Sequence, residues 1–135
     1  MTVFVCVDDR CGVLFNCRRV SSDRAVISDI LKITETQPLR IREFSEKLFP
    51  ENSMIYIGED YLSGAGKGDF VFFEDVITNV FWKKAERVVV YHWNRQYPSD
   101  VKFPLDALRE RGKLESSLTF AGNSHNEITR EVYIL

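Results

Sequence analysis

The order of strand-like and helix-like segments is the feature that most constrains the fold. Short apolar segments typical of β-strands alternate with amphipathic segments up to about residue 93, and only strand-like segments follow. The expected strands are Thr2–Val7, Leu39–Ile41, Met54–Gly58, Phe70–Phe73, Arg87–Trp93, Leu114–Phe120 and Ile128–Ile134. The last two alternate polar and apolar residues, as half-buried antiparallel strands do. This order predicts an α/β fold with a mostly parallel, helix-covered sheet and an antiparallel C-terminal hairpin.

The helix-like segments lie between the parallel strands. Ser21 or Ser22 is the expected N-cap of the first helix, with Asp23 in its first turn, and apolar residues at helical spacing extend this helix to about Thr34. The other expected helical segments are Arg42–Phe49, one or two turns within Glu59–Ala65, and a helix capped by Asp75 that carries Val76, Ile77, Val80, Phe81 and Ala85. Arg95–Ser99 is expected to be a loop, and Lys102–Pro104 is expected to be a short extended segment.

Length and charge exclude several classes of protein. The 135 residues form one expected domain, 1–135, with ten Phe, five Tyr and two Trp to fill a core. A net charge of −2 argues against a nucleic-acid partner held by a broad basic face. No apolar run is long enough for a membrane helix, and the N-terminus lacks the basic and cleavage regions of a signal peptide. We therefore expect a cytoplasmic protein.

The cysteine and histidine residues do not suggest a metal site. Cys6, Cys11 and Cys17 are odd in number and lack metal-ligand spacing, so reduced thiols are expected, and Cys6 lies in an apolar strand. His92 and His125 are far from them in sequence. We also find no Ser–His–Asp order, nucleophile elbow or metallohydrolase histidine cluster.

Several segments together resemble the dihydrofolate reductase family. That family has a strong apolar strand, an Asp-x-x-Phe-Pro motif and a closing β-hairpin, and this chain has Val88–Trp93, Asp100–Pro104 and Leu114–Leu135 in that order. Near the N-terminus, a first strand runs into Asp9–Gly12, and Asp23 stands at the acidic position of the first helix. The resemblance implies a three-layer sandwich and implies that Asp23 is the acid that family members use to hydrogen-bond the pterin ring.

The chain departs from the family at four functional positions. The cofactor motif Gly-Arg-x-Thr is replaced by Ile41–Phe44, of which only Arg42 survives. No Gly-Gly pair occurs, and Val71–Arg87 is too short for the extra strand and helix that carry it. The lid motif Leu-Pro-Trp is replaced by Phe15–Arg18, and Pro50–Ser53 stands where the family has the arginine that grips the folate tail. These departures predict that no cofactor is used and that NADPH is not bound.

The candidate site residues each have a structural and a functional interpretation. Asp23 is either a tentative catalytic acid or base, or an ordinary first-turn acid that stabilises the helix. The basic cluster of Arg18, Arg19 and Arg24, and separately Arg42, either bind an anion or are solvated.

Aromatic and polar residues follow the strongest strand. Trp93, Arg95 and Tyr97 either line a cleft or partner surface or form a packed corner. Gly64–Asp69 lacks the spacing of a phosphate-binding loop and is expected to be a turn, and His125 is expected to be structural.

Three functions follow as hypotheses. The first is a dihydrofolate-reductase-like domain that binds a small molecule or a protein partner without the family's catalysis. The second is an enzyme of altered chemistry that uses Asp23 as acid or base on a small anionic substrate, bound by Arg18, Arg19 or Arg42 and assisted by Tyr97. The third is an interaction module that pairs with a partner or with a second copy of the chain.

Overall fold

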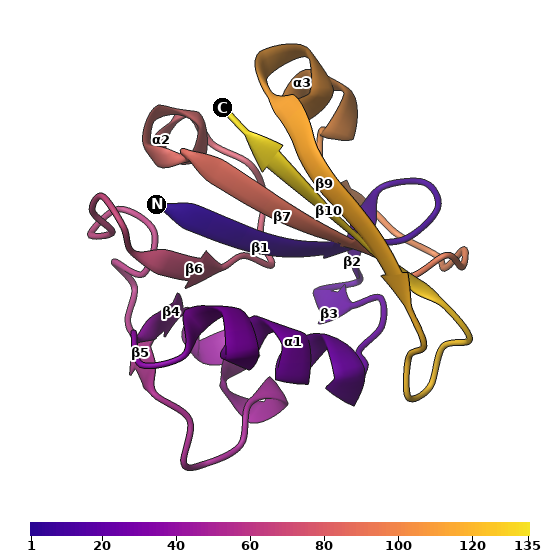
Figure 1. Cartoon of the computed structure of the whole chain (residues 1–135), viewed down its shortest axis with the longest axis horizontal. Helices are drawn as coiled ribbons and strands as arrows, with labels where there is room; N and C mark the ends of the chain where they lie inside the picture. The colour runs from indigo at the N-terminus through magenta and orange to yellow at the C-terminus, as the bar shows by residue number, and fades with distance from the viewer.

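A seven-stranded sheet forms the centre of the computed structural model, which describes residues 1–135 (Figure 1). Its strands are β1 (Thr2–Val7), β4 (Leu39–Ile41), β5 (Ile55–Ile57), β6 (Phe70–Phe72), β7 (Arg87–His92), β9 (Lys113–Phe120) and β10 (Ile128–Ile134). Their order is β5-β4-β6-β1-β7-β10-β9, and pairing is parallel from β5 to β7. Strand β10 pairs antiparallel with β7 and β9. The expected parallel sheet with an antiparallel hairpin is therefore confirmed.

Alternating side chains of the central strands divide the apolar interior into two layers. In β1, Val3 and Val5 join one core cluster and Phe4 joins the other. The Phe4 side is covered by α1 (Arg24–Thr34) and by the end of the 3-10 helix η1 (Glu43–Leu48), as Figure 1 shows for α1. The Val3 side is covered by α2 (Asn79–Lys84) and α3 (Leu105–Arg111). Burial on both faces explains why β1 is an almost unbroken apolar run.

A second, three-stranded sheet lies beside the carboxyl end of β1. It consists of β2 (Gly12–Phe15), β3 (Arg18–Arg19) and β8 (Val101–Lys102), in the order β3-β2-β8. Both of its pairings are antiparallel. This small sheet positions Arg18 and Arg19 just before α1.

Local details differ from the sequence-based expectations in four places. The N-cap of α1 is Asp23 rather than Ser21 or Ser22, because Asp23 has extended backbone angles and its Oδ1 accepts from the amide of Ala25 at 2.8 Å. Helix α2 begins after Thr78 rather than after Asp75, because the carboxylate of Asp75 bonds to the next amide and to Tyr61 instead. Residues 59–65 form successive turns.

The fourth difference is α3, for which the sequence analysis assigned no element. Only two of its seven residues, Leu105 and Leu108, are buried, so its apolar pattern is too short to show a helical period. The three cysteines are free thiols. No helix of the chain combines the length and the apolar character that a membrane span requires.

Candidate functional site

The carboxylate of Asp23 lies where the start of α1 meets the turn between β9 and β10. Its oxygens accept hydrogen bonds from the backbone amides of Asn123, Ser124 and His125 at 2.8–3.1 Å, in addition to its cap to Ala25. Asp23 is only 4% exposed. The turn therefore closes over the acid that the sequence analysis singled out.

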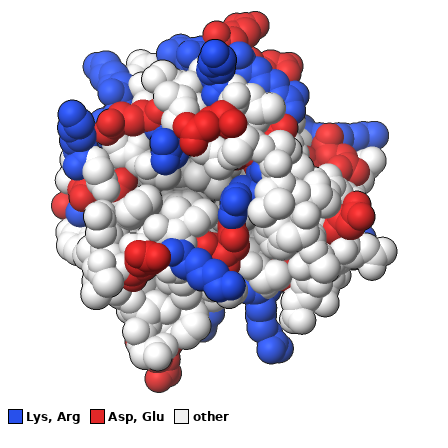
Figure 2. All heavy atoms as spheres, in the orientation of Figure 1, with Lys and Arg blue, Asp and Glu red and all other residues white.

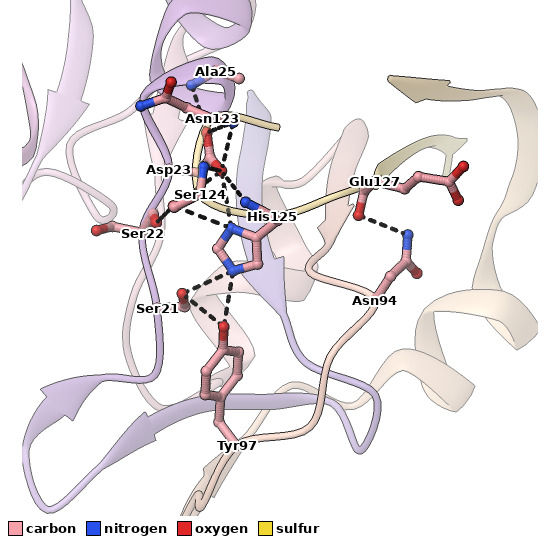
Figure 3. Close-up of polar contacts among 10 residues, drawn as sticks. All are labelled: Ser21, Ser22, Asp23, Ala25, Asn94, Tyr97, Asn123, Ser124, His125 and Glu127. Atoms are coloured by element: carbon pink, nitrogen blue, oxygen red, sulfur yellow. Dashed lines mark hydrogen bonds and ion pairs between the residues drawn. The ribbon is translucent and has the colours of Figure 1, made fainter. Parts of the chain in front are cut away.

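The ring of His125 connects this carboxylate to two hydroxyl groups (Figure 3). Its Nδ1 lies 2.9 Å from Oδ2 of Asp23. On the other side of the ring, Nε2 lies 2.9 Å from the hydroxyl of Tyr97 and 3.0 Å from Oγ of Ser21. The two hydroxyls are themselves 3.2 Å apart. The four side chains form one hydrogen-bonded chain, in which Asp23 and His125 are buried and Ser21 and Tyr97 are half-buried.

The surroundings of Asp23 keep it ionised. Burial by itself would raise the pKa of Asp23, but hydrogen bonds from His125 and from the amides of Asn123, Ala25 and Ser124 outweigh it and lower the pKa far below its ordinary value. A permanently ionised carboxylate on Nδ1 assigns the proton of the neutral ring to Nδ1. Nε2 is then the acceptor that faces the hydroxyls of Ser21 and Tyr97.

Trp93 and Tyr97 form the wall around His125. The indole of Trp93 is 3% exposed and stacks on the imidazole, with 4.7 Å between ring centroids. Its Nε1 has no hydrogen-bond partner. The amide of Tyr97 donates to Oδ2 of buried Asp8 at 2.9 Å. Both aromatic residues therefore pack around His125. Each of the two interpretations, a packed corner and the wall of a cleft, describes part of their position.

A second cluster surrounds Glu74 between β6 and α2. Arg19 donates two hydrogen bonds of 2.9 Å to its carboxylate, and Ser45 donates a third of 2.8 Å. Arg42 donates to the carbonyl of Glu74 and forms a weak ion pair with Asp75 at 4.0 Å. Glu74 is 6% exposed. Of the arginines proposed as anion ligands, Arg19 thus already holds the carboxylate of Glu74, and Arg42 is engaged by a backbone carbonyl and by Asp75.

The remaining predicted residues lie elsewhere. Arg18 and Arg95 are exposed and form no ion pair, and Arg95 lines a polar hollow beside His125. The structure thus brings Asp23, Trp93 and Tyr97 together, with Arg95 at the hollow beside them. It places Arg19 and Arg42 around Glu74, and it leaves Arg18 apart. No three His, Cys, Asp or Glu side chains gather as metal ligands do.

A groove of about 750 Å³ lies between α1 and the end of η1. Its floor is apolar and is formed by Ile27, Leu31, Leu48 and Phe49. Three cations, Arg24, Lys32 and Lys47, also line it, and none of them has a carboxylate partner within 4 Å. On the face of the molecule shown in Figure 2, basic and acidic side chains are intermingled, and neither sign forms a continuous field. The groove thus combines an apolar floor with three cations that have no carboxylate partner.

The sequence analysis missed the polar role of Ser21, the pairing of His125 with Asp23, and the groove. Ser21, Asp23 and His125 occur along the chain in the order Ser–Asp–His, which is the order of one known class of hydrolases, but Ser21 stands in no nucleophile elbow, so the sequence offered no specific signal for the cluster. For the groove, the basic residues at 24, 32 and 47 are spread over two elements and show no pattern along the chain.

The sheet order, the helices on both faces and the closing hairpin define a dihydrofolate-reductase-like fold. A dihydrofolate reductase from Enterococcus faecalis, solved in complex with NADP(H) and RAB-propyl, superimposes with a TM-score of 0.64. The match covers 98% of this chain and 94% of that chain, at 12% sequence identity. No family model matches the sequence, and no curated protein does. The expected fold is therefore confirmed, and at this identity the likeness concerns the fold alone.

Proposed function

We propose that this protein binds a small molecule with an apolar body and an anionic group in the groove between α1 and η1, and that it is not an NADPH-dependent reductase. The observation that carries the proposal is the set of three unpaired cations, Arg24, Lys32 and Lys47, around an apolar floor. The groove volume lies within the range of small-molecule sites, roughly 300–1,000 Å³. An aryl carboxylate or a similar amphiphilic anion fits both properties of the lining.

Two features argue against folate reduction. The carboxylate oxygens of Asp23 accept hydrogen bonds from the turn at 123–125, so a pterin would have to displace that turn to reach them. The span between β6 and α2, where the resembled family carries its Gly-Gly phosphate clamp, has Glu74 and Asp75. Carboxylates there would repel the phosphates of a nicotinamide cofactor. The proposal therefore includes no cofactor.

The test is thermal unfolding of the whole chain with defined probes: 1-naphthoate, folic acid, adenosine monophosphate and NADPH. A ligand at a hundredfold excess over its Kd adds about 2.7 kcal/mol to the free energy of unfolding, which raises Tm measurably. We expect a rise with 1-naphthoate or folic acid. The rise should be lost in the double variant Lys32→Glu, Lys47→Glu and retained in the matched variant Lys83→Glu, Lys113→Glu, whose lysines are exposed outside the groove.

Two results would overturn this proposal. One is the absence of any Tm change with both aryl carboxylates. The other is a Tm rise with NADPH together with turnover of dihydrofolate. That result would show that the protein is a reductase although the carboxylate of Asp23 already accepts hydrogen bonds from residues 123–125.

Self-association is a second candidate function, favoured by the edge strand β9. None of its eight residues is buried, and Leu114 and Leu118 are about half exposed. An unpaired strand edge can pair with a second copy of the chain. Light scattering at increasing concentration tests this: a dimer that Leu118→Lys converts to a monomer supports pairing through β9, and a monomer at all concentrations excludes it.

A further inference from the structure

We infer that Ser21 is a nucleophile activated by His125, so that the cluster at the start of α1 hydrolyses a small carboxylic ester. A hydroxyl nucleophile within hydrogen-bond reach of a base, with that base oriented by a third group, is the structural signature of covalent acyl transfer. Here Oγ of Ser21 lies 3.0 Å from Nε2 of His125, and Nδ1 of His125 lies 2.9 Å from Asp23. Both distances lie within the range of 2.6–3.2 Å, roughly, that such a relay requires.

The protonation states support this assignment. Asp23 is ionised and holds the proton on Nδ1, so Nε2 can accept the proton of the serine hydroxyl. A histidine with a purely structural role would need only one partner on Nε2. This one faces two hydroxyls, those of Ser21 and Tyr97, and both are half-buried rather than sealed.

Tyr97 places a phenol beside the reacting oxygen. Its hydroxyl accepts from Oγ of Ser21 at 3.2 Å. When Ser21 bonds to a carbonyl carbon, negative charge develops on the adjacent carbonyl oxygen, and a nearby phenol stabilises such charge by donating a hydrogen bond. The stacked indole of Trp93 holds the imidazole in place from the side.

The reaction balances without any cofactor. Oγ of Ser21 forms a bond to the acyl carbon while its proton passes to Nε2 of His125, and the ester C–O bond breaks as that proton passes to the departing alcohol. Water then attacks the acyl group, its proton passes to Nε2, and the bond to Oγ breaks as Ser21 regains its proton. The net change is ester plus water to carboxylic acid plus alcohol.

The groove indicates which acyl group the ester carries, and this assignment of the acyl group rests on the proposed function. Ser22, Asp23 and Arg24, which directly follow Ser21, line the groove. An ester whose acyl part carries an apolar body and an anionic group would place that part among Ile27, Leu31 and Lys32.

The test uses diisopropyl fluorophosphate, which labels activated serines whatever their substrate. We expect one adduct per folded chain by intact mass, located at Ser21 by peptide mapping. Ser21→Ala should abolish it, and Ser116→Ala, which removes an exposed serine of β9, should leave it unchanged. Ser21→Ala loses only one partly exposed hydroxyl, so it is expected to fold, and its Tm is measured alongside.

Asp23 acts through His125 and is therefore a positioning residue. In Asp23→Asn the favoured tautomer is reversed, so labelling of Ser21 should slow at least a hundredfold and its dependence on pH should change. A role in folding alone would lower Tm and leave the pH dependence of labelling in the folded fraction unaltered.

The outcomes separate this inference from the proposed function. No adduct on the folded wild-type chain, or an adduct that survives Ser21→Ala, overturns the nucleophile. Labelling of Ser21 without any ligand-induced rise in Tm supports the nucleophile and contradicts the groove. A rise in Tm without labelling supports the groove and shows that the cluster only stabilises the fold.

Discussion

Oδ2 of Asp23 and Nδ1 of His125 lie 2.9 Å apart although 102 positions separate the two residues in the chain. The contact joins the N-cap residue of α1 to the turn between β9 and β10. Because both side chains are almost completely buried, their interaction is screened little by water or salt. The stability of the fold and the geometry of the candidate site therefore depend on the same pair.

Replacing Asp23 by Asn is expected to destabilise the protein strongly. The amide group of Asn would face the backbone donors of residues 123–125, and the loss of one partner from a buried pair costs about 3–5 kcal/mol. Urea unfolding measures the loss. Asp9→Asn, which changes an exposed acid without contacts, should alter the free energy of unfolding by less than about 0.5 kcal/mol. Equal effects of the two substitutions would contradict the role of the pair.

Stability should fall in acid because of Asp23. Its pKa is lowered by folding, so its stabilising contribution is complete above the unfolded value of about 3.9 and is lost progressively as pH falls toward the folded value. Urea midpoints between pH 7 and pH 2 should therefore fall steeply below about pH 4. The slope should be shallower for Asp23→Asn, and an unchanged slope would mean that other carboxylates control the acid response.

Gly122 is expected to tolerate no side chain. A Cβ atom at this position would lie 2.6 Å from the carbonyl oxygen of His125 and 2.8 Å from Oδ2 of Asp23. Gly122→Ala should therefore push the turn away from Asp23 and cost about 1–3 kcal/mol. Gly66→Ala is the matched control, because the nearest atom to its Cβ is 3.7 Å away. If both variants unfold at the same urea concentration, the close approach at Gly122 does not limit which side chain this position can hold.

Glu74→Gln should both destabilise the protein and expose an anion site. Arg19 would lose its charged partner, which we expect to cost about 2 kcal/mol because its side chain is partly exposed. Inorganic phosphate should then raise the Tm of the variant more than that of the wild type, since Arg19 loses its carboxylate partner and is freed to bind it. Glu59→Gln serves as the control. A variant with no added response to phosphate would show that Arg19 finds another partner.

Much of the fold follows from local sequence patterns. Leu39–Ile41 and Ile128–Ile134 were predicted with the bounds that the structure has, because strong apolar segments flanked by turn residues determine strands locally. Helix α3 was missed because Pro104 and four exposed residues conceal two buried leucines. Asp75 was a plausible helix cap by residue type, but one oxygen of its carboxylate accepts a hydrogen bond from the hydroxyl of Tyr61, which is distant in sequence.

The candidate site was only partly predictable. Asp23, Trp93 and Tyr97 were identified because each follows or begins a recognisable element. Their link through His125 depends on how one turn is folded, and no periodic pattern records the direction of a single side chain. The anion-binding role expected for Arg19 and Arg42 stays a prediction. Arg19 pairs with the carboxylate of Glu74, and Arg42 donates to the backbone carbonyl of Glu74 and lies 4.0 Å from the carboxylate of Asp75.

The long separation of Asp23 and His125 also has a consequence for the order of folding. Parallel pairing of β1 with β6 and β7 already requires loops of more than sixty residues to close, and such non-local contacts slow folding. Until β10 docks against β7, the carboxylate of Asp23 has only its local bond to Ala25. Docking of the C-terminal hairpin adds the amides of residues 123–125 and the ring of His125 to a helix that is already capped locally, so a chain truncated before the hairpin would keep the bond to Ala25 and lack the Ser21–His125 contact.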